Sequence, residues 1–181
     1  EQTTFKWRID GFSSLLDKDG GSSYSSVFEM LGINWYMKLN PMHKNSGDQN
    51  KYVSLRLELS QASVRPDTVV EAYFKFLIYD QSYGKHCEHE ASHNFQREST
   101  SSGVSCMMPL TTLKEESSGF LVNNSCVFGV EFIRVTTAKA NDTSETLFVQ
   151  KSNNTFSSPV VYTWDIEDFF ALKENRQLSR V

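Results

Sequence analysis

Strict alternation of apolar and polar residues is the feature of this sequence that most limits its fold. The segment Val53–Leu59 reads Val-Ser-Leu-Arg-Leu-Glu-Leu, with every second residue apolar. The longer segment Val69–Tyr79 alternates in the same way around Ala, Phe, Phe and Ile. A period of two residues is typical of a β-strand with one buried face. The chain has no long stretch with the 3.6-residue period of an amphipathic helix, so we predict an all-β fold.

The rest of the first 135 residues contains further short strand patterns separated by turn-forming residues. The further predicted strands are 5–10, 24–31, 33–39, which ends at Asn40-Pro41, 92–96, 104–108 and 125–135, and a helical turn is predicted at 109–113. Short strands at this spacing favour a β-sandwich or barrel over alternating strands and helices. Trp35 is a predicted core residue.

The two ends of the chain carry the same pattern of residues. Trp164, Ile166 and Phe169 each lie 157 positions after Trp7, Ile9 and Phe12. We therefore predict three parts, namely a domain at 1–135, a linker at 136–159, and the start of a second, truncated repeat at 160–181. The linker is rich in Thr, Ser and Asn, with a short strand expected at 147–149.

Composition and charge exclude several classes of function. The formal net charge is −4 and the pI about 5.6, which argues against sequence-independent binding to nucleic acid. No apolar run is long enough to span a bilayer, and we expect a cytoplasmic protein without a cofactor. The three cysteines, Cys87, Cys106 and Cys126, form no CxxC pair and are expected to be free thiols, with Cys106 and Cys126 buried and inert.

A series of motifs in the first unit resembles the MATH (meprin and TRAF homology) domain, most closely in tandem-domain proteins of plants. The motifs are Phe5-x-Trp7-x-Ile9-x-x-Phe12, Tyr24-Ser-Ser-Val-Phe28, Gly32-Ile-Asn-Trp-Tyr-Met-Lys-Leu-Asn-Pro41, Val53-Ser-Leu-Arg-Leu57, Tyr79-Asp-Gln81, Met108-Pro-Leu-x-x-Leu113 and Gly119-Phe-Leu-Val-Asn-Asn-Ser-Cys126. The resemblance implies an eight-stranded antiparallel β-sandwich of the TRAF-like type, followed here by a C-terminal extension. It also implies a non-catalytic adaptor that binds extended peptide segments of partner proteins, with a link to ubiquitin-dependent turnover.

The resemblance also implies where a peptide would bind. Aligning the strands with the family's groove places five residues in it, namely Arg56, Phe74, His93, Ser102 and Val104. Ser102 and Arg56 stand where relatives often have aromatic residues, so we expect a less aromatic groove. For Phe74 the alternative is core packing, and for Arg56 it is a solvated face of a strand.

Two other functions stay open at this point. The first is self-association as a structural module of an oligomeric scaffold. The second is a zinc peptidase, because His89, Glu90 and His93 match the HExxH pattern. That pattern binds zinc on a helix, where both histidines share one face. Here it lies among predicted strands, and we therefore favour a polar loop without metal.

Overall fold

The computed structural model describes residues 3–18, 21–140, 144–149 and 160–165, with side chains described up to residue 140. The chain divides into two compact units, 1–138 and 139–181, and each is considered by itself.

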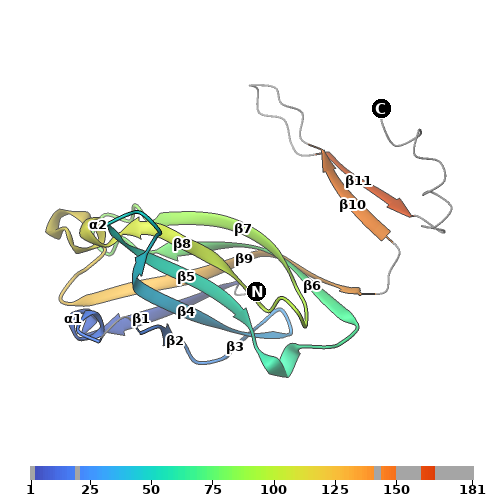
Figure 1. The fold of residues 1–181 in the computed structure, drawn as a ribbon, viewed down its shortest axis with the longest axis horizontal. Coiled ribbons are helices and arrows are strands. Elements are labelled where there is room, and N and C mark those ends of the chain that lie inside the picture. The colour runs from blue at the N-terminus through green and yellow to red at the C-terminus, as the bar shows by residue number, and fades with distance from the viewer. Residues whose placement is uncertain (1–2, 19–20, 141–143, 150–159, 166–181) are drawn as a thin grey trace. The chain divides into compact units, whose positions relative to one another are not determined.

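The first unit is a β-sandwich of two antiparallel sheets (Figure 1). One sheet holds, in order, β1 (Thr4–Asp10), β9 (Ser125–Lys139), β6 (Thr68–Ile78) and β7 (Cys87–Phe95). The other holds β2 (Ser23–Tyr24), β4 (Ile33–Lys44), β5 (Lys51–Leu59) and β8 (Ser101–Pro109), with β3 (Phe28–Met30) also paired to β4. Short helical segments are α1 (Phe12–Leu16), η1 (Gln61–Ser63), α2 (Leu110–Lys114) and η2 (Glu116–Ser118). The predicted eight-stranded sandwich is confirmed, with β3 as an additional short strand.

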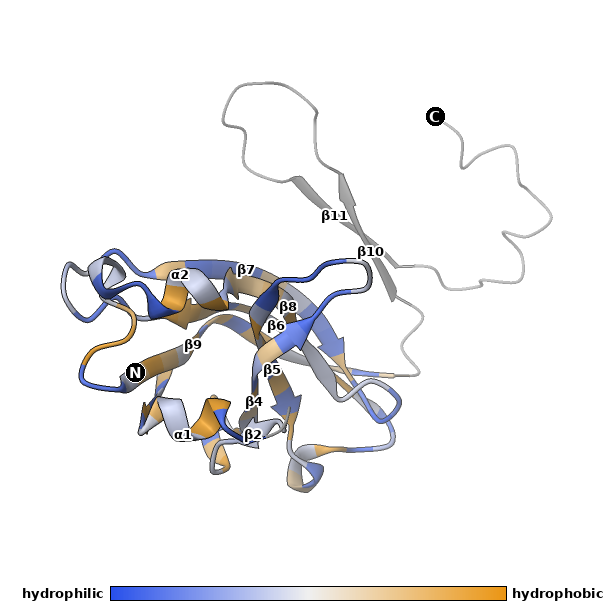
Figure 2. Cartoon of the chain, turned by 60° about the vertical axis from the view of Figure 1, so that its left-hand side comes forward, coloured by the Kyte–Doolittle hydropathy of each residue, from blue (hydrophilic) through white to orange (hydrophobic). Residues whose placement is uncertain are grey.

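The core lies between the sheets and is built from the apolar positions of the alternating strands. Trp35 is fully buried and packs against Phe95 and Phe132, with ring centroids 5.0 and 5.1 Å away. The strands differ in hydropathy: β7 is mostly hydrophilic, while β9 carries several apolar residues (Figure 2). Phe95 is the one residue of β7 among the described buried apolar residues, whereas β9 contributes Phe128, Val130 and Phe132.

Several predicted boundaries differ from the structure. β4 continues through Pro41 to Lys44, because the pairing with β5 shifts register between Asn40 and His43. A proline in such an irregular pairing removes no regular ladder hydrogen bond. β9 runs to Lys139, past the predicted domain limit at residue 135. The helix α1 is too short for its period to be recognised in the sequence.

The two open sides of the sandwich are filled differently. On the side where β1 and β3 lie, Phe5 stacks on Phe28 with ring centroids 3.9 Å apart, and Phe28 also contacts Phe132. Aromatic side chains therefore close this side. The other side lies between β7 and β8, which are the last strands of their sheets and are joined by a tight turn in which Gln96 pairs with Ser99.

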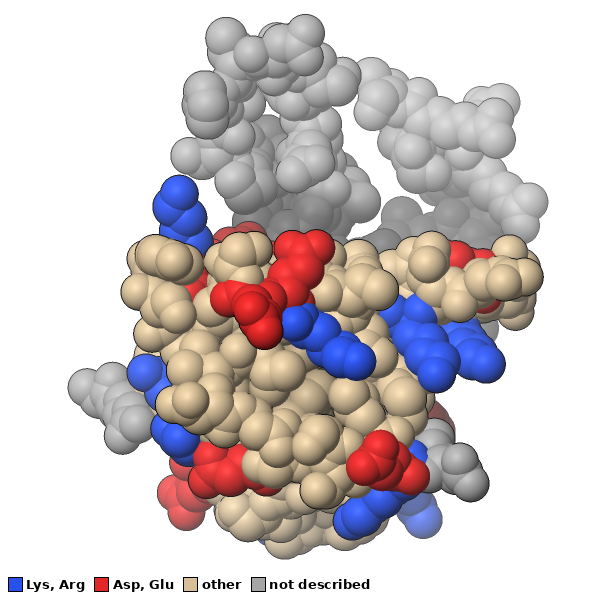
Figure 3. Space-filling view, turned by 90° about the vertical axis from the view of Figure 1, so that its left-hand side faces the viewer, with Lys and Arg blue, Asp and Glu red and all other residues tan. Residues whose placement is uncertain are grey.

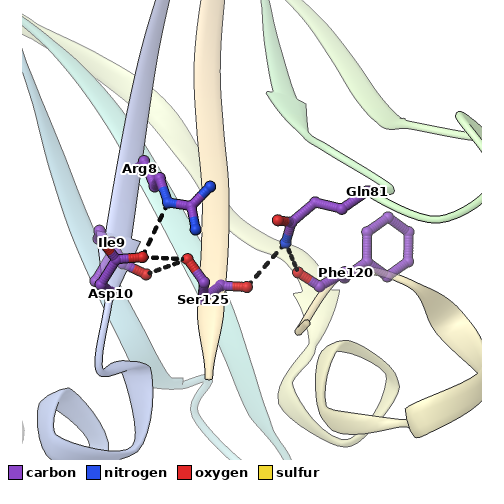
Figure 4. Close-up of polar contacts among 6 residues, drawn as sticks. All are labelled: Arg8, Ile9, Asp10, Gln81, Phe120 and Ser125. Atoms are coloured by element: carbon purple, nitrogen blue, oxygen red, sulfur yellow. Dashed lines mark hydrogen bonds and ion pairs between the residues drawn. The ribbon is translucent and has the colours of Figure 1, made fainter. Parts of the chain in front are cut away.

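The end of the sandwich that carries α1 and α2 is held by polar contacts. Seen from this end, charged side chains of both signs surround a largely uncharged centre (Figure 3). The buried Ser125 donates a hydrogen bond of 2.5 Å to Asp10, which also pairs with Arg8 (Figure 4). The Gln81 amide donates to the carbonyl oxygens of Ser125 and Phe120. These bonds join β1, β9 and the loop after β6.

In the second unit, β10 (Ser144–Val149) pairs antiparallel with β11 (Val160–Asp165). β10 includes the strand expected at 147–149, and β11 contains Trp164, the counterpart of Trp7. The remaining residues of the predicted second repeat, 166–181, lie outside the described residues. Its identity as the start of a second domain stays a prediction. Among the described helices, none has the length and apolar character needed to cross a membrane.

Candidate functional site

The free edge of β8 is the candidate site. β8 ends the strand order of its sheet, so no described strand pairs with it on the side away from β5. The opposite edge of the sheet is blunted, because β2 and β3 are only two and three residues long. Between them, the Ser25 hydroxyl accepts a hydrogen bond from the backbone N–H of Met37. Short, interrupted strands protect a sheet edge from further pairing, whereas β8 offers nine residues.

The pairing register shows which backbone groups of β8 face outward. The N–H of Leu59 donates to the carbonyl of Thr100, so these two residues form a hydrogen-bonded pair. In an antiparallel ladder, hydrogen-bonded and non-bonded pairs alternate. Ser101 and Gly103, opposite Glu58 and Arg56, therefore occupy non-bonded positions. Their N–H and C=O groups point away from β5, where a further strand would bind.

Three of the five predicted site residues face the space between the sheets on the two strands at this side. Ser102 and Val104 are opposite the buried residues Leu57 and Leu55, and paired residues share a face of the sheet. Both side chains therefore point toward the space between the sheets. His93 on β7 faces the same space, since its partner Ala72 is buried.

These three side chains lie on the inner faces of the strands at the β7–β8 side of the sandwich. His93, Ser102 and Val104 are each partly exposed. The His93 ring packs against Phe95, and its Nε2 lies 2.8 Å from the Ser99 hydroxyl. An inward-pointing ligand side chain would thus meet a mixed polar and apolar surface here.

Phe74 does not belong to this surface. Its side chain is fully buried and packs against Phe76, Phe95 and Phe132. The prediction that it lines a groove does not fit this burial, and the alternative of core packing describes it. The error has a simple cause: alternation places Phe74 on the inner face of β6, but β6 is an interior strand of its sheet.

Arg56 lies on the outer face of the sheet on β5, one strand in from the free edge of β8. Its Nε donates a 2.7 Å hydrogen bond to the Ser101 hydroxyl, which in turn donates to Glu58 over 2.7 Å. Its guanidinium also forms an ion pair with Glu58, with Nε 3.8 Å from Oε1, and its terminal nitrogens donate no hydrogen bond to the described residues. A Cβ at Gly103 would lie 2.3 Å from the Leu55 carbonyl oxygen and 2.6 Å from the Arg56 Cγ, so the absence of a side chain there lets β8 lie close against β5 and the Arg56 side chain.

A second cation on this face was missed by sequence reasoning. Lys38 is directly opposite Arg56 on β4. Its ammonium lies 5.7 Å from the ring centroid of Tyr24 and, within the described part of the chain, pairs with no carboxylate. Two adjacent cations repel each other unless an anion approaches. The alternation of β4 places Lys38 outward, but its position beside Arg56 depends on a pairing register that the sequence does not show.

Comparison with known proteins identifies the fold family. A family model for the MATH domain matches residues 4–132. The chain belongs to the MATH domain family. A MATH domain and coiled-coil domain-containing protein of Arabidopsis thaliana is 27% identical over 187 residues, covering all of this chain and 58% of that protein. Ubiquitin C-terminal hydrolase 12 of the same plant is 27% identical over 129 residues, covering 70% of this chain but 11% of the hydrolase.

The fold agrees with a solved structure of the same type. TRAF5 of Notothenia coriiceps superposes with a TM-score of 0.57 at 19% identity, covering 74% of each chain. The chain spans only part of the length of the two plant relatives named above. MATH domains are protein–protein interaction modules, and the resemblance to plant members of the family is confirmed.

The HExxH pattern of this MATH domain lies on a strand. His89, Glu90 and His93 are all within β7, and not in the loop that we expected. At about 3.3 Å per residue, the two histidine backbones are about 13 Å apart along the strand, instead of one helical turn apart as zinc binding by HExxH requires. Glu90 points to the opposite face, where Tyr73 donates to it over 2.5 Å. The described residues contain no cluster suited to holding a metal.

The cysteines differ from one another in this domain. All three are free. Cys126 is buried, and burial raises the pKa of its thiol to about 12, so it is inert at neutral pH. Cys87 is half-buried, with a pKa also raised by burial. Cys106 is exposed on β8, which corrects the expectation that it is buried.

Proposed function

We propose that this chain is a non-catalytic adaptor domain that binds an extended peptide segment of a partner protein along the free edge of β8. The observation that carries the proposal is the outward orientation of the backbone groups of Ser101 and Gly103. A peptide in extended conformation would continue the sheet through these groups, as in other cases of β-strand addition. Its alternate side chains would point to the two faces of the sheet.

The two faces suggest the chemistry of the ligand. An outward side chain opposite Gly103 would lie beside Arg56, with Lys38 one strand further in. We propose an acidic residue at this position, because a carboxylate would bind the free guanidinium nitrogens and relieve the repulsion between the cations. The neighbouring inward residues would be small or apolar, since they face Ser102 and Val104.

The wider setting is also part of the proposal. One similar protein is a ubiquitin C-terminal hydrolase, which supports a role in delivering partners to ubiquitin-dependent turnover. Three free thiols are consistent with a cytoplasmic location, where disulfides are rare. A tandem arrangement, if residues 160–181 begin a second domain, would raise the avidity for partners with two such segments.

A random library of twelve-residue peptides displayed on phage, panned on the full 181-residue chain, tests the proposal. Selected peptides are then synthesised and their Kd values measured by fluorescence polarisation. We expect an acidic residue in the selected peptides. N-methylation should abolish binding at every second backbone position and be tolerated between them, because alternate amides of an added strand face β8.

Variants locate the site. Arg56→Glu should weaken the acidic peptides by about tenfold or more, while Lys6→Glu, a matched charge reversal on the outer face of the other sheet, should leave binding unchanged. Peptides that tolerate N-methylation everywhere would show that no strand is added. Equal loss in both variants would place the effect in net charge rather than in the β8 edge.

A further inference from the structure

The outer face beside β8 contains a hydroxyl group between two opposite charges. Ser101 Oγ is 2.7 Å from Arg56 Nε and 2.7 Å from Glu58 Oε1, while Nε and Oε1 are 3.8 Å apart. A direct charge-assisted hydrogen bond between Arg and Glu would be about 2.7–2.9 Å long, and 3.8 Å is too long for one. The ion pair is therefore held open by the serine.

A hydroxyl is suited to this position because it can donate and accept at the same time. Ser101 accepts from the guanidinium and donates to the carboxylate. The Glu58 side chain is only 12% exposed, so its carboxylate needs a hydrogen-bond donor nearby. Without the hydroxyl, the strongest donor within reach would be Arg56 itself, whose side chain is 36% exposed and free to turn.

Resting on the proposed function, we propose that Ser101 is a positioning residue that keeps Arg56 available for an anionic ligand. It supplies Glu58 with a donor and fixes Arg56 through Nε alone. The terminal nitrogens of Arg56 then stay available on the outer face of the sheet, where an outward side chain of the added strand would reach them across Gly103. Loss of the hydroxyl would let Arg56 close onto Glu58, so that an internal carboxylate replaces the carboxylate of the ligand.

Four variants of the full chain test this inference, with an acidic peptide from the library and its Glu→Gln counterpart as probes. Ser101→Ala should weaken the binding of the acidic peptide by about fivefold to tenfold and leave the affinity for the Gln peptide unchanged. Ser101→Thr keeps the hydroxyl and should bind like the parent chain. Glu58→Gln removes the competing charge and should not weaken the acidic peptide. The double variant Ser101→Ala/Glu58→Gln should recover the affinity that Ser101→Ala loses.

Each contrary result overturns the inference. Unchanged binding by Ser101→Ala would show that a hydroxyl spacer between Arg56 and Glu58 is not needed. Loss of peptide affinity in Ser101→Thr would show a requirement for the size of the side chain rather than for its hydroxyl. A double variant as weak as Ser101→Ala would show that Glu58 does not compete for Arg56.

A measurement on the free protein separates this inference from the proposed function. The side-chain Nε–H resonance of Arg56 can be followed by NMR without any ligand. In Ser101→Ala we expect this group to be hydrogen-bonded to Glu58, with a resonance that changes again when Glu58→Gln is added. If the library yields no peptide, the proposed function fails, and this resonance still decides whether Ser101 separates the two charges. No change in Ser101→Ala would refute the spacer role.

Discussion

Gly119 and Asp80 depend on each other at the scale of single atoms. Gly119 has a φ of +76°, and a Cβ on it would lie within 2.1 Å of the Asp80 Oδ1. The same carboxylate accepts hydrogen bonds from the backbone N–H groups of Ser82, Tyr83 and Lys85. A side chain at Gly119 would therefore displace a group that organises the loop between β6 and β7.

Gly119→Ala should be markedly more destabilising than Gly84→Ala. Gly84 has almost the same φ, +73°, but open space where a Cβ would be. It therefore reports the backbone cost alone, about 1 kcal/mol. Gly119→Ala adds the steric clash, for a total loss of about 3 kcal/mol. Urea unfolding followed by tryptophan fluorescence measures both, and equal losses would show that Asp80 moves aside freely.

Single residues also show what alternation can and cannot predict. The period of two correctly assigns Trp35 and Phe74 to the inner face of their strands, and both are fully buried. It does not say whether a strand is interior or at an edge. That distinction decides that Val104, on an inner face at an edge, is partly exposed while Phe74 is not.

At the scale of the elements, the β3–β4 hairpin contains a residue in an unfavourable conformation. Met30 pairs with Ile33, so Leu31 and Gly32 form a two-residue turn, with φ values of +55° and +77°. Two successive positive φ values are typical of the type I′ turn, which favours Asn-Gly. A leucine in this position costs about 1 kcal/mol.

Leu31→Asn should therefore stabilise the domain, by about 0.5–1 kcal/mol. Leu31 is 37% exposed, so little buried apolar surface is lost. Leu31→Ala is the matched control, because it removes the side chain without the asparagine preference for positive φ. Calorimetric melting temperatures distinguish the two, and a gain shared by both variants would attribute the effect to the exposed leucine instead of to the turn.

The loop after β6 should give the domain a dependence on acidic pH. Backbone N–H groups donate hydrogen bonds to the Asp80 carboxylate, and the largest effect comes from that of Tyr83. These bonds hold the pKa of the carboxyl below the ordinary value of 3.8. A lowered pKa in the folded state contributes stability above the unfolded pKa, and this contribution is lost as the pH falls through the folded pKa.

Asp80→Asn should lower the melting temperature at pH 7, and the difference from the parent chain should shrink below about pH 4. Asp17→Asn removes the same charge at an exposed position and serves as the control. Thermal melts from pH 7 to pH 2.5 measure the effect. A difference that stays constant over this range would mean that the asparagine acts through geometry and not through the lost charge.

At the scale of the whole molecule, the fold was accessible from the sequence but the site was only partly so. Alternation and motif order predict the sandwich, because both can be recognised within short stretches of the sequence. The arrangement of Lys38, Arg56, Glu58 and Ser101 depends on the registers of β4, β5 and β8. Ser101 is 45 positions from Arg56, and nothing local to either residue specifies that they meet.

The same scale decides which part of the chain the first unit needs. The described core and the apolar residues packed against it all come from positions up to Val135. β9, which completes the sheet with β1 and β6, ends at Lys139. A chain ending at residue 139 thus keeps the strands and side chains that bury apolar surface in this unit.

We therefore expect residues 1–139 to unfold cooperatively with the same stability as this unit has in the full chain, to within about 0.5 kcal/mol. Urea unfolding followed by the fluorescence of Trp7 and Trp35, with Trp164→Phe in the full chain to remove the signal of the second unit, makes the comparison direct. Peptides selected on the full chain should bind the shorter one equally well, because the β8 edge lies within it. A clear loss of stability in the shorter chain would show that residues after 139 contribute to the first sandwich, and the boundary between the units would then have to move.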